Sequence, residues 1–219
     1  MPASPFEVVR PRLAPQLVAG AGAVLGEDQK WEALAVTGDF AGQQADELEV
    51  SGCRITGSTL AGAQVARARV TDTVFTRCDL SAADLGSAVL HRVEFIDCRL
   101  WGADWAGAQL NDVLFCECRL VEASLRMVTA KRLRFQGCDL TGADFYGAQL
   151  AGACLYDCDL TGAELSRATL TGARLHGSHF ETLRGADSLR GVTISSAQIV
   201  PVGLQLLGVF AVRVDDSEV

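Results

Sequence analysis

The sequence predicts an all-β solenoid, and three features of the chain carry that prediction. A large apolar residue recurs at every fifth position over roughly two-thirds of the 219 residues, a small residue stands two positions before it, and cysteine repeats every twenty residues. A period of five matches neither the 3.6-residue period of a helix nor the two-residue period of a strand. Repeats of this kind bury their apolar series only by stacking coil on coil, which is the principle of a solenoid.

The two short-period series define the lining of the predicted tube. The large series runs from Phe40 to Phe180, and only Ala45 and Ala130 are small within it. Two inward positions per five residues, one large and one small, suit a narrow interior, and the other three positions are mostly polar. Glycine often follows two residues after the large one, where it eases the tight turn between short sides.

The twenty-residue period sets the size of one coil. It is seen in Cys78, Cys98, Cys118, Cys138 and Cys158, and again in Phe75, Phe95, Phe115 and Phe135. Twenty residues are four units of five, so each coil should have four sides with like residues stacked above one another. Residues 38–182 then make about seven coils and a stack roughly 34 Å tall, at the ~4.8 Å spacing of paired strands.

The two ends differ from the repeats. Residues 1–37 lack the five-residue repeat and are expected to form an extended N-terminal cap, with Trp31 closing the first coil. Residues 183–219 are expected to form a C-terminal cap. In that cap, Ser195 and Gln198 match a capping box, a short helix includes Pro201 in its first turn, and residues 212–214 form a terminal strand.

Two runs in the middle of the chain resemble a known family. The residues 138–150 read CDLTGADFYGAQL, and residues 158–165 read CDLTGAEL. Both are similar to the pentapeptide-repeat family, whose pattern is A-(D/N)-L-x-x, and the resemblance extends over residues 38–182. It implies a right-handed quadrilateral β-helix, whereas fold and function are separable properties.

Composition narrows the class of protein. The chain carries a formal net charge of −8 and a pI near 4.9, which disfavours direct binding of nucleic acid. Only 6% of the residues are aromatic, as a thin core requires. The N-terminal residues do not read as a signal peptide, and the most apolar window, residues 199–212, is shorter than the ~20 residues that span a bilayer. We therefore expect a cytoplasmic protein that does not enter membranes.

Catalytic and metal-binding motifs are missing from the sequence. It has three histidines, of which only His176 and His179 are close together, and it has no phosphate-binding, dinucleotide-binding or nucleophile-elbow motif. Six of the eight cysteines fall on the small inward position and are expected to be buried free thiols, while Cys116 and Cys154 fall on outward positions. We expect no enzyme activity, no cofactor and no metal site.

The outer surface is therefore the expected place of function. One side presents an acidic column, made of Asp84, Asp104, Ser124, Asp144 and Glu164. Several members of the family bind DNA gyrase or topoisomerase IV as acidic rods that mimic DNA, and they protect these enzymes from quinolones or other poisons. The resemblance implies the same partner here, although a basic cluster between Arg126 and Arg134 interrupts the acidic surface.

The alternative is a general protein-interaction scaffold with another partner. Apolar residues stand at outward positions and are typical of an interface: Ile96, Trp101, Leu114, Val121 and Tyr156. A further apolar group lies near the C-terminus: Leu204, Leu206, Leu207, Val209 and Phe210. These residues could serve only to cap the solenoid, or they could also form the contact of a homodimer. The family resemblance implies a dimer through the C-terminal end, and both alternatives remain open.

Overall fold

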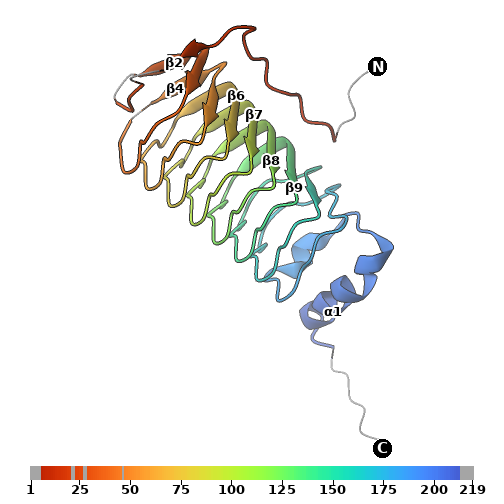
Figure 1. Cartoon of the computed structure of the whole chain (residues 1–219). Coiled ribbons are helices and arrows are strands. Elements are labelled where there is room, and N and C mark those ends of the chain that lie inside the picture. The colour runs from red at the N-terminus through yellow and green to blue at the C-terminus, as the bar shows by residue number, and fades with distance from the viewer. Residues whose placement is uncertain (1–5, 21–22, 27–28, 46, 213–219) are drawn as a thin grey trace, which may run out of the picture.

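The chain folds into a parallel β-solenoid whose coils stack along one axis (Figure 1). It is seen in a computed structural model that describes residues 6–20, 23–26, 29–45 and 47–212. Neighbouring coils are related by twenty residues: Phe75 is paired with Phe95, and Phe95 with Phe115. The predicted fold and coil length are confirmed.

Strands occupy only part of each coil, because the other sides are single bridged residues between turns. The strands that the described residues contain are β1 (Val18–Ala19), β2 (Lys30–Glu32), β3 (Leu34–Val36), β4 (Glu49–Ser51), β5 (Arg54–Thr56), β6 (Arg69–Thr76), β7 (Val89–Ile96), β8 (Gln109–Cys116), β9 (Thr129–Gln136) and β10 (Cys154–Tyr156). All pair in parallel, in the order β1-β3-β5-β6-β7-β8-β9-β10, and β4 joins β2 to β6. Each eight-residue strand from β6 to β9 turns one corner of the tube.

The corners explain the positions of the glycines. At a typical corner, the N–H of Ala103 donates to the carbonyl oxygen of Leu100 at 3.1 Å, and Gly102 between them has φ of 61°. A positive φ at the third residue defines a type II turn, in which glycine is the residue without steric cost. The glycine pattern of the sequence thus marks real turns.

The interior is a stack of like side chains. The rings of Phe75, Phe95, Phe115 and Phe135 lie parallel with centroids 4.7, 4.8 and 4.9 Å apart. Trp105 meets two of these rings edge-on from the opposite wall. All eight cysteines are free, and the six inward ones are buried as predicted. Burial raises the pKa of the Cys53 thiol, which keeps it protonated.

Parallel pairing extends beyond the five-residue series at both ends. It begins at Val18, which is paired with Leu34, and it ends with the bridge between Arg174 and Thr193. Trp31 lies within β2, is paired with Val50 and is buried, so it lines a coil as an ordinary inward residue. The sequence pattern does not reveal these coils because β2 and β4 are nineteen residues apart, which breaks the frame of five.

The C-terminal end is closed by helices. Two 3-10 turns, η1 (Ala186–Leu189) and η2 (Ser196–Gln198), lead into the helix α1 (Ile199–Val209). The predicted capping box forms, and the N–H of Ser195 donates to Gln198 Oε1 at 2.8 Å. The Gln198 amide also donates to the carbonyl oxygens of Leu175 and Ser178, which ties the cap to the last coil. The strand predicted at residues 212–214 lies largely outside the described residues.

Candidate protein-interaction faces

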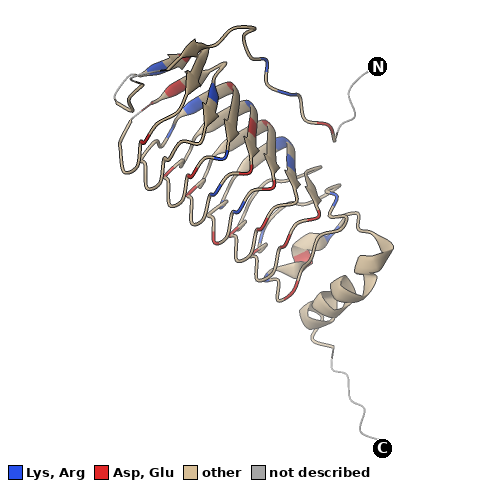
Figure 2. Cartoon of the chain, in the orientation of Figure 1, with Lys and Arg blue, Asp and Glu red and all other residues tan. Residues whose placement is uncertain are grey.

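The acidic column exists as a continuous row along the rod. Parallel bridges join Asp84 to Asp104, Asp104 to Ser124, Ser124 to Asp144 and Asp144 to Glu164. Adjacent members are therefore one coil apart, about 4.8 Å. Figure 2 shows acidic positions recurring from coil to coil, with basic positions between them.

Each carboxylate of this column also stabilises its own corner. One oxygen accepts the backbone N–H two residues on, at 2.8 Å from Gly86 for Asp84 and at 2.8 Å from Ala106 for Asp104. This is an Asx turn, which satisfies an N–H that the tight corner would leave free. The repeated Asp of the sequence therefore has a structural reason, and the second oxygens of Asp84 and Asp104 remain available to a partner.

The column is more neutral toward its C-terminal end. Arg126 pairs with Asp144 at 2.7 Å, and Arg184 pairs with Glu164 at 3.1 Å. Hydrogen bonds from Ser166 and the charge of Arg184 hold the pKa of Glu164 below its ordinary value, against its burial. Within the described part of the chain, no ion pair is formed by Asp84 or Asp104. These two carboxylates are the charged end of the column.

The predicted apolar set is divided between two sides. Trp101 is 57% exposed and lines a shallow depression of about 400 Å³ together with Val121, Arg99 and Arg119; we call this the Trp101 patch. Its indole N–H lies 3.4 Å from Glu122 Oε2, so the ring is held at the surface by one weak hydrogen bond.

The other side is occupied by the chain itself. Ile96 and Tyr156 are half-buried, whereas Leu114 is only 8% exposed. The prediction that Leu114 is an open interface residue is therefore wrong. Cys154, which also stands at an outward position, is buried as well. Both lie beside an N-terminal segment that the sequence predicts only as a cap.

That segment, residues 6–12, is here called the N-terminal strap. In Figure 1 it leaves the β2 end of the rod and runs back along the side of the long strands. The N–H of Arg12 donates to Asp72 Oδ1 at 2.9 Å, and the N–H of Val9 donates to Asp112 Oδ1 at 3.1 Å. Because the strap crosses the coils, its N–H groups cannot join the parallel ladder and bond to carboxylates instead.

Side chains of the strap complete the contact. Arg10 Nη1 pairs with Glu94 Oε1 at 2.9 Å. Val8 and Leu114 are both buried and line one cavity of about 220 Å³ between the strap and the strands. Farther along the rod, the guanidinium of Arg174 lies 3.6 Å from the ring centroid of Phe6. The Cys154 thiol points to the Phe6 carbonyl oxygen, 3.9 Å away.

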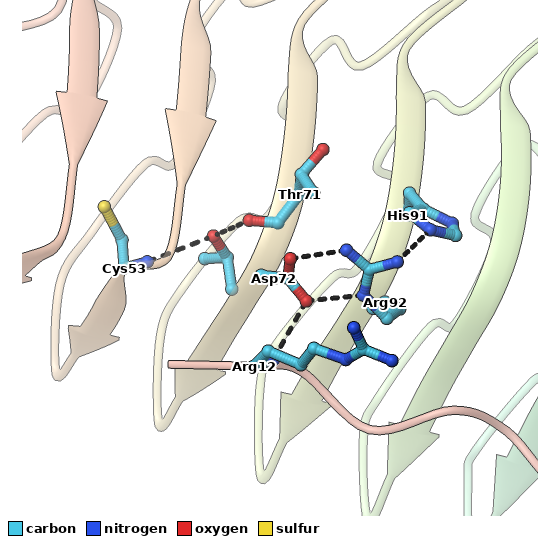
Figure 3. Close-up of polar contacts among 7 residues, drawn as sticks. Arg12, Cys53, Thr71, Asp72, His91 and Arg92 are labelled. Carbon is cyan, nitrogen blue, oxygen red and sulfur yellow. Dashed lines mark hydrogen bonds and ion pairs between the residues drawn. The ribbon is translucent and has the colours of Figure 1, made fainter. Parts of the chain in front are cut away.

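A row of alternating charges lies under the strap. It is formed by Asp72, Arg92, Asp112 and Arg132, which succeed one another at the same corner of β6 to β9 and all have positive φ. Arg92 binds both oxygens of Asp72, as Figure 3 shows together with the N–H of Arg12. These bonds hold the pKa of Asp72 below its ordinary value.

The Asp112–Arg132 pair makes the stability of the protein depend on pH. Burial opposes the charge of Asp112, yet hydrogen bonds from Arg132 and from the N–H of Val9 keep its pKa below the ordinary value. A carboxylate with a lowered folded pKa contributes stability that is present above the unfolded value of about 4 and is lost as pH falls through the folded pKa.

We expect Arg132→Met to weaken the fold at pH 7 and to reduce the loss of stability on acidification, because the folded pKa of Asp112 rises and no longer lies well below the unfolded value. The change keeps an apolar stem and removes the partner of a buried carboxylate, which costs about 3–5 kcal/mol when the remaining charge is fully buried. Urea unfolding at pH 7 and pH 4 measures it. Arg119→Met, which removes an exposed arginine, is the control, and equal curves for both variants would contradict the assignment.

The apolar C-terminal group also separates into two kinds of residue. Leu206 packs against the core and Leu207 is half-buried, so these two belong to the cap. Leu204 is 62% exposed, Val209 is 43% exposed and Phe210 is 74% exposed. The outer side of α1 is therefore an apolar surface at the end of the rod.

No three His, Cys, Asp or Glu side chains among the described residues are placed to hold a metal ion. No helix in the same part of the chain is both long and apolar enough to cross a bilayer.

These features define a four-sided parallel β-solenoid with charged and apolar outer faces and a helical cap. The sequence matches the model of the pentapeptide repeat region over residues 48–125 and the model of pentapeptide repeats over residues 128–162 and 155–182. The chain belongs to the pentapeptide-repeat family.

Solved structures of similar proteins include two with reported roles. Full-length QnrB1, a plasmid-mediated fluoroquinolone resistance protein, is 24% identical, with a TM-score of 0.48 over 83% of this chain and 99% of that one. HetL is a pentapeptide repeat protein involved in heterocyst differentiation regulation, from the cyanobacterium Nostoc sp. strain PCC 7120. It is 20% identical, with a TM-score of 0.38 over 81% of this chain and 94% of that one. Among curated protein sequences, none matches significantly.

Proposed function

We propose that this chain is a non-catalytic binding protein whose acidic column engages a protein partner that ordinarily binds duplex DNA. DNA gyrase and topoisomerase IV are the candidate partners. The observation that carries the proposal is the row of carboxylates stacked coil on coil, of which Asp84 and Asp104 form no ion pair within the described residues. A rod with charge along its length enters a groove built for phosphates by electrostatic complementarity.

The charge density sets the strength of this mimicry. Duplex DNA carries one negative charge per ≈ 1.7 Å of axis, whereas the column offers at most one per coil of ~4.8 Å. The protein is therefore expected to compete with DNA at low salt and to be displaced as salt is raised, because exposed charges are screened over about 8 Å at physiological ionic strength.

The acidic column is tested by substitutions that remove charge and keep the corners. We expect a variant with Asp84→Asn, Asp104→Asn and Asp144→Asn to lose about tenfold or more in binding, because three negative charges are removed. The corners should persist, since an Asn oxygen still accepts the N–H of each Asx turn. The readout is gyrase-catalysed supercoiling, with and without a quinolone.

A neighbouring column offers a matched control for this test. Asp79, Asp139 and Asp159 make the same turn at the next corner, accepting N–H groups at 2.9, 3.1 and 2.9 Å. Replacing these three by Asn should leave the effect on gyrase nearly intact. If the wild-type chain neither inhibits gyrase, protects it from a poison nor forms a complex by native mass spectrometry, the proposal fails.

The alternative function is a scaffold that binds a partner through the Trp101 patch. It is favoured by one observation, the 57% exposure of Trp101 beside Val121. Aromatic residues of this kind are enriched at the centres of interfaces. Loss of partner binding on Trp101→Ser, with no effect of the three Asn substitutions, would select this function.

We also propose that two copies associate through the outer side of α1, where Leu204 and Phe210 are exposed. A dimer would remove this apolar surface from water. Light scattering during size-exclusion chromatography is expected to give twice the chain mass for the wild type and a monomer for Leu204→Asp or Phe210→Asp. Arg190→Glu, at the same end of the rod, is the control, and a wild-type monomer at high concentration would contradict the proposal.

A further inference from the structure

The face under the N-terminal strap has the properties of a peptide-binding groove. It places an acidic group, Glu94, and an apolar group, Leu114, on adjacent coils and buries both, at 5% and 8% exposure. The side chains that bury them come from an extended segment that belongs to no coil. The groove is thus already seen with an extended peptide in place.

The register of this peptide follows from simple geometry. Arg12 and Val9 are three residues apart and reach Asp72 and Asp112, which are two coils apart. Three extended residues span about 10 Å and two coils about 9.6 Å, so the match requires no bend in the strap. An extended chain therefore fits this face at three residues per two coils.

The strap can detach without leaving a buried charged group unpaired. Asp72 keeps Arg92, and Asp112 keeps Arg132, when the two backbone N–H groups depart. Glu94 has Arg10 as the ion-pair partner, and the Arg10 side chain is 72% exposed, so water replaces it at modest cost. Departure instead uncovers Leu114 and Cys154, and apolar surface of this kind favours a new occupant.

We propose that this face is a docking groove for an extended peptide of a partner protein, which the chain's own strap occupies until it is displaced. The chemistry of the occupant is read from the strap: an aromatic residue, an aliphatic residue two positions on, and an arginine two positions after that. The Phe6 ring packs against the Arg174 guanidinium, and Arg10 forms an ion pair with Glu94. Val8 lines the same cavity as Leu114.

The experiment uses the full chain with a weakened strap. The variant Val8→Asp with Arg10→Glu leaves every groove residue unchanged and sets two acidic groups against Glu94 and Leu114. The probe is a labelled synthetic peptide with the sequence of residues 6–12, followed by fluorescence anisotropy. We expect saturable binding to this variant, at least about tenfold tighter than to the wild type, whose groove is filled. Glu7→Gln, an exposed strap position, is the matched control and should behave as the wild type.

A charge-swapped pair tests specificity. The full chain with Glu94→Arg should reject the wild-type peptide and bind a peptide that carries Arg10→Glu. Amide hydrogen exchange of Val9 and Arg12 reports whether the strap has left, since both N–H groups are bonded in the wild type.

Four results would overturn the proposal. They are an absence of peptide binding to the weakened-strap variant, equal binding to that variant and the wild type, and unchanged exchange of the Val9 and Arg12 amides in the variant. The fourth is a wild-type dimer that Arg10→Glu dissociates, because a second copy would then be the occupant of the groove.

Discussion

Replacing Phe115 by alanine is expected to cost about 3–5 kcal/mol of unfolding free energy, the range for a fully buried phenylalanine. Its side chain has 0% exposure, and its ring lies 4.8 Å from Phe95 and 4.9 Å from Phe135. The tube is only one side chain deep on each wall. The neighbouring coils are held at strand spacing by the backbone ladder, so they cannot close the cavity.

Urea unfolding at constant pH measures this loss. Thr141→Ser, on the outer surface of the same tube, is the control and is expected to stay within about 0.5 kcal/mol of the wild type. Because Trp105 touches the Phe115 ring edge-on, its fluorescence should also change in the folded variant. A loss below about 1 kcal/mol would mean that the phenylalanine stack does not support the coils.

Overpacking the small series is expected to be the second large effect. Ala143 has 0% exposure and stands between Leu140 and Phe145, which are fully buried too. Ala143→Leu adds three carbon atoms at a position with no exposed surface, and it should cost about 1–3 kcal/mol or more. Leu140→Met keeps the side-chain volume nearly constant and should cost less than about 1.5 kcal/mol.

The comparison of these two variants tests which side of the wall the small residues face. Chemical denaturation midpoints are sufficient, because both changes keep the charge of the chain. If Ala143→Leu is neutral while Leu140→Met destabilises, the small series is not part of the lining.

Local pattern was enough for the coils, and the reason is their repetition. Phe95 and Phe115 predict each other's place because one short unit recurs, so a contact between coils is encoded as a fixed spacing in sequence. The same reasoning places Asp84 over Asp104, and the capping box at Ser195 is likewise a local signal.

The strap shows where this reasoning stops. The bond from Val9 to Asp112 joins residues 103 positions apart, and no period connects them. The repeat pattern places Leu114 and Cys154 at outward positions and predicts an open interface at Leu114, because it contains nothing about the segment that covers them. A weak clue was present in Phe6, Val8 and Arg10, which alternate as an extended segment would.

The sequence by itself determined the solenoid, the four-sided coil, the lining and the acidic column, because each depends on residues at constant separation. Only the tertiary structure decided that the N-terminal residues lie across the coils, that Leu114 and Cys154 are covered, and that Leu206 faces the core while Leu204 faces water. These depend on where a non-repeating segment finds complementary charge and apolar surface, which is a property of the assembled faces and of no single stretch of chain.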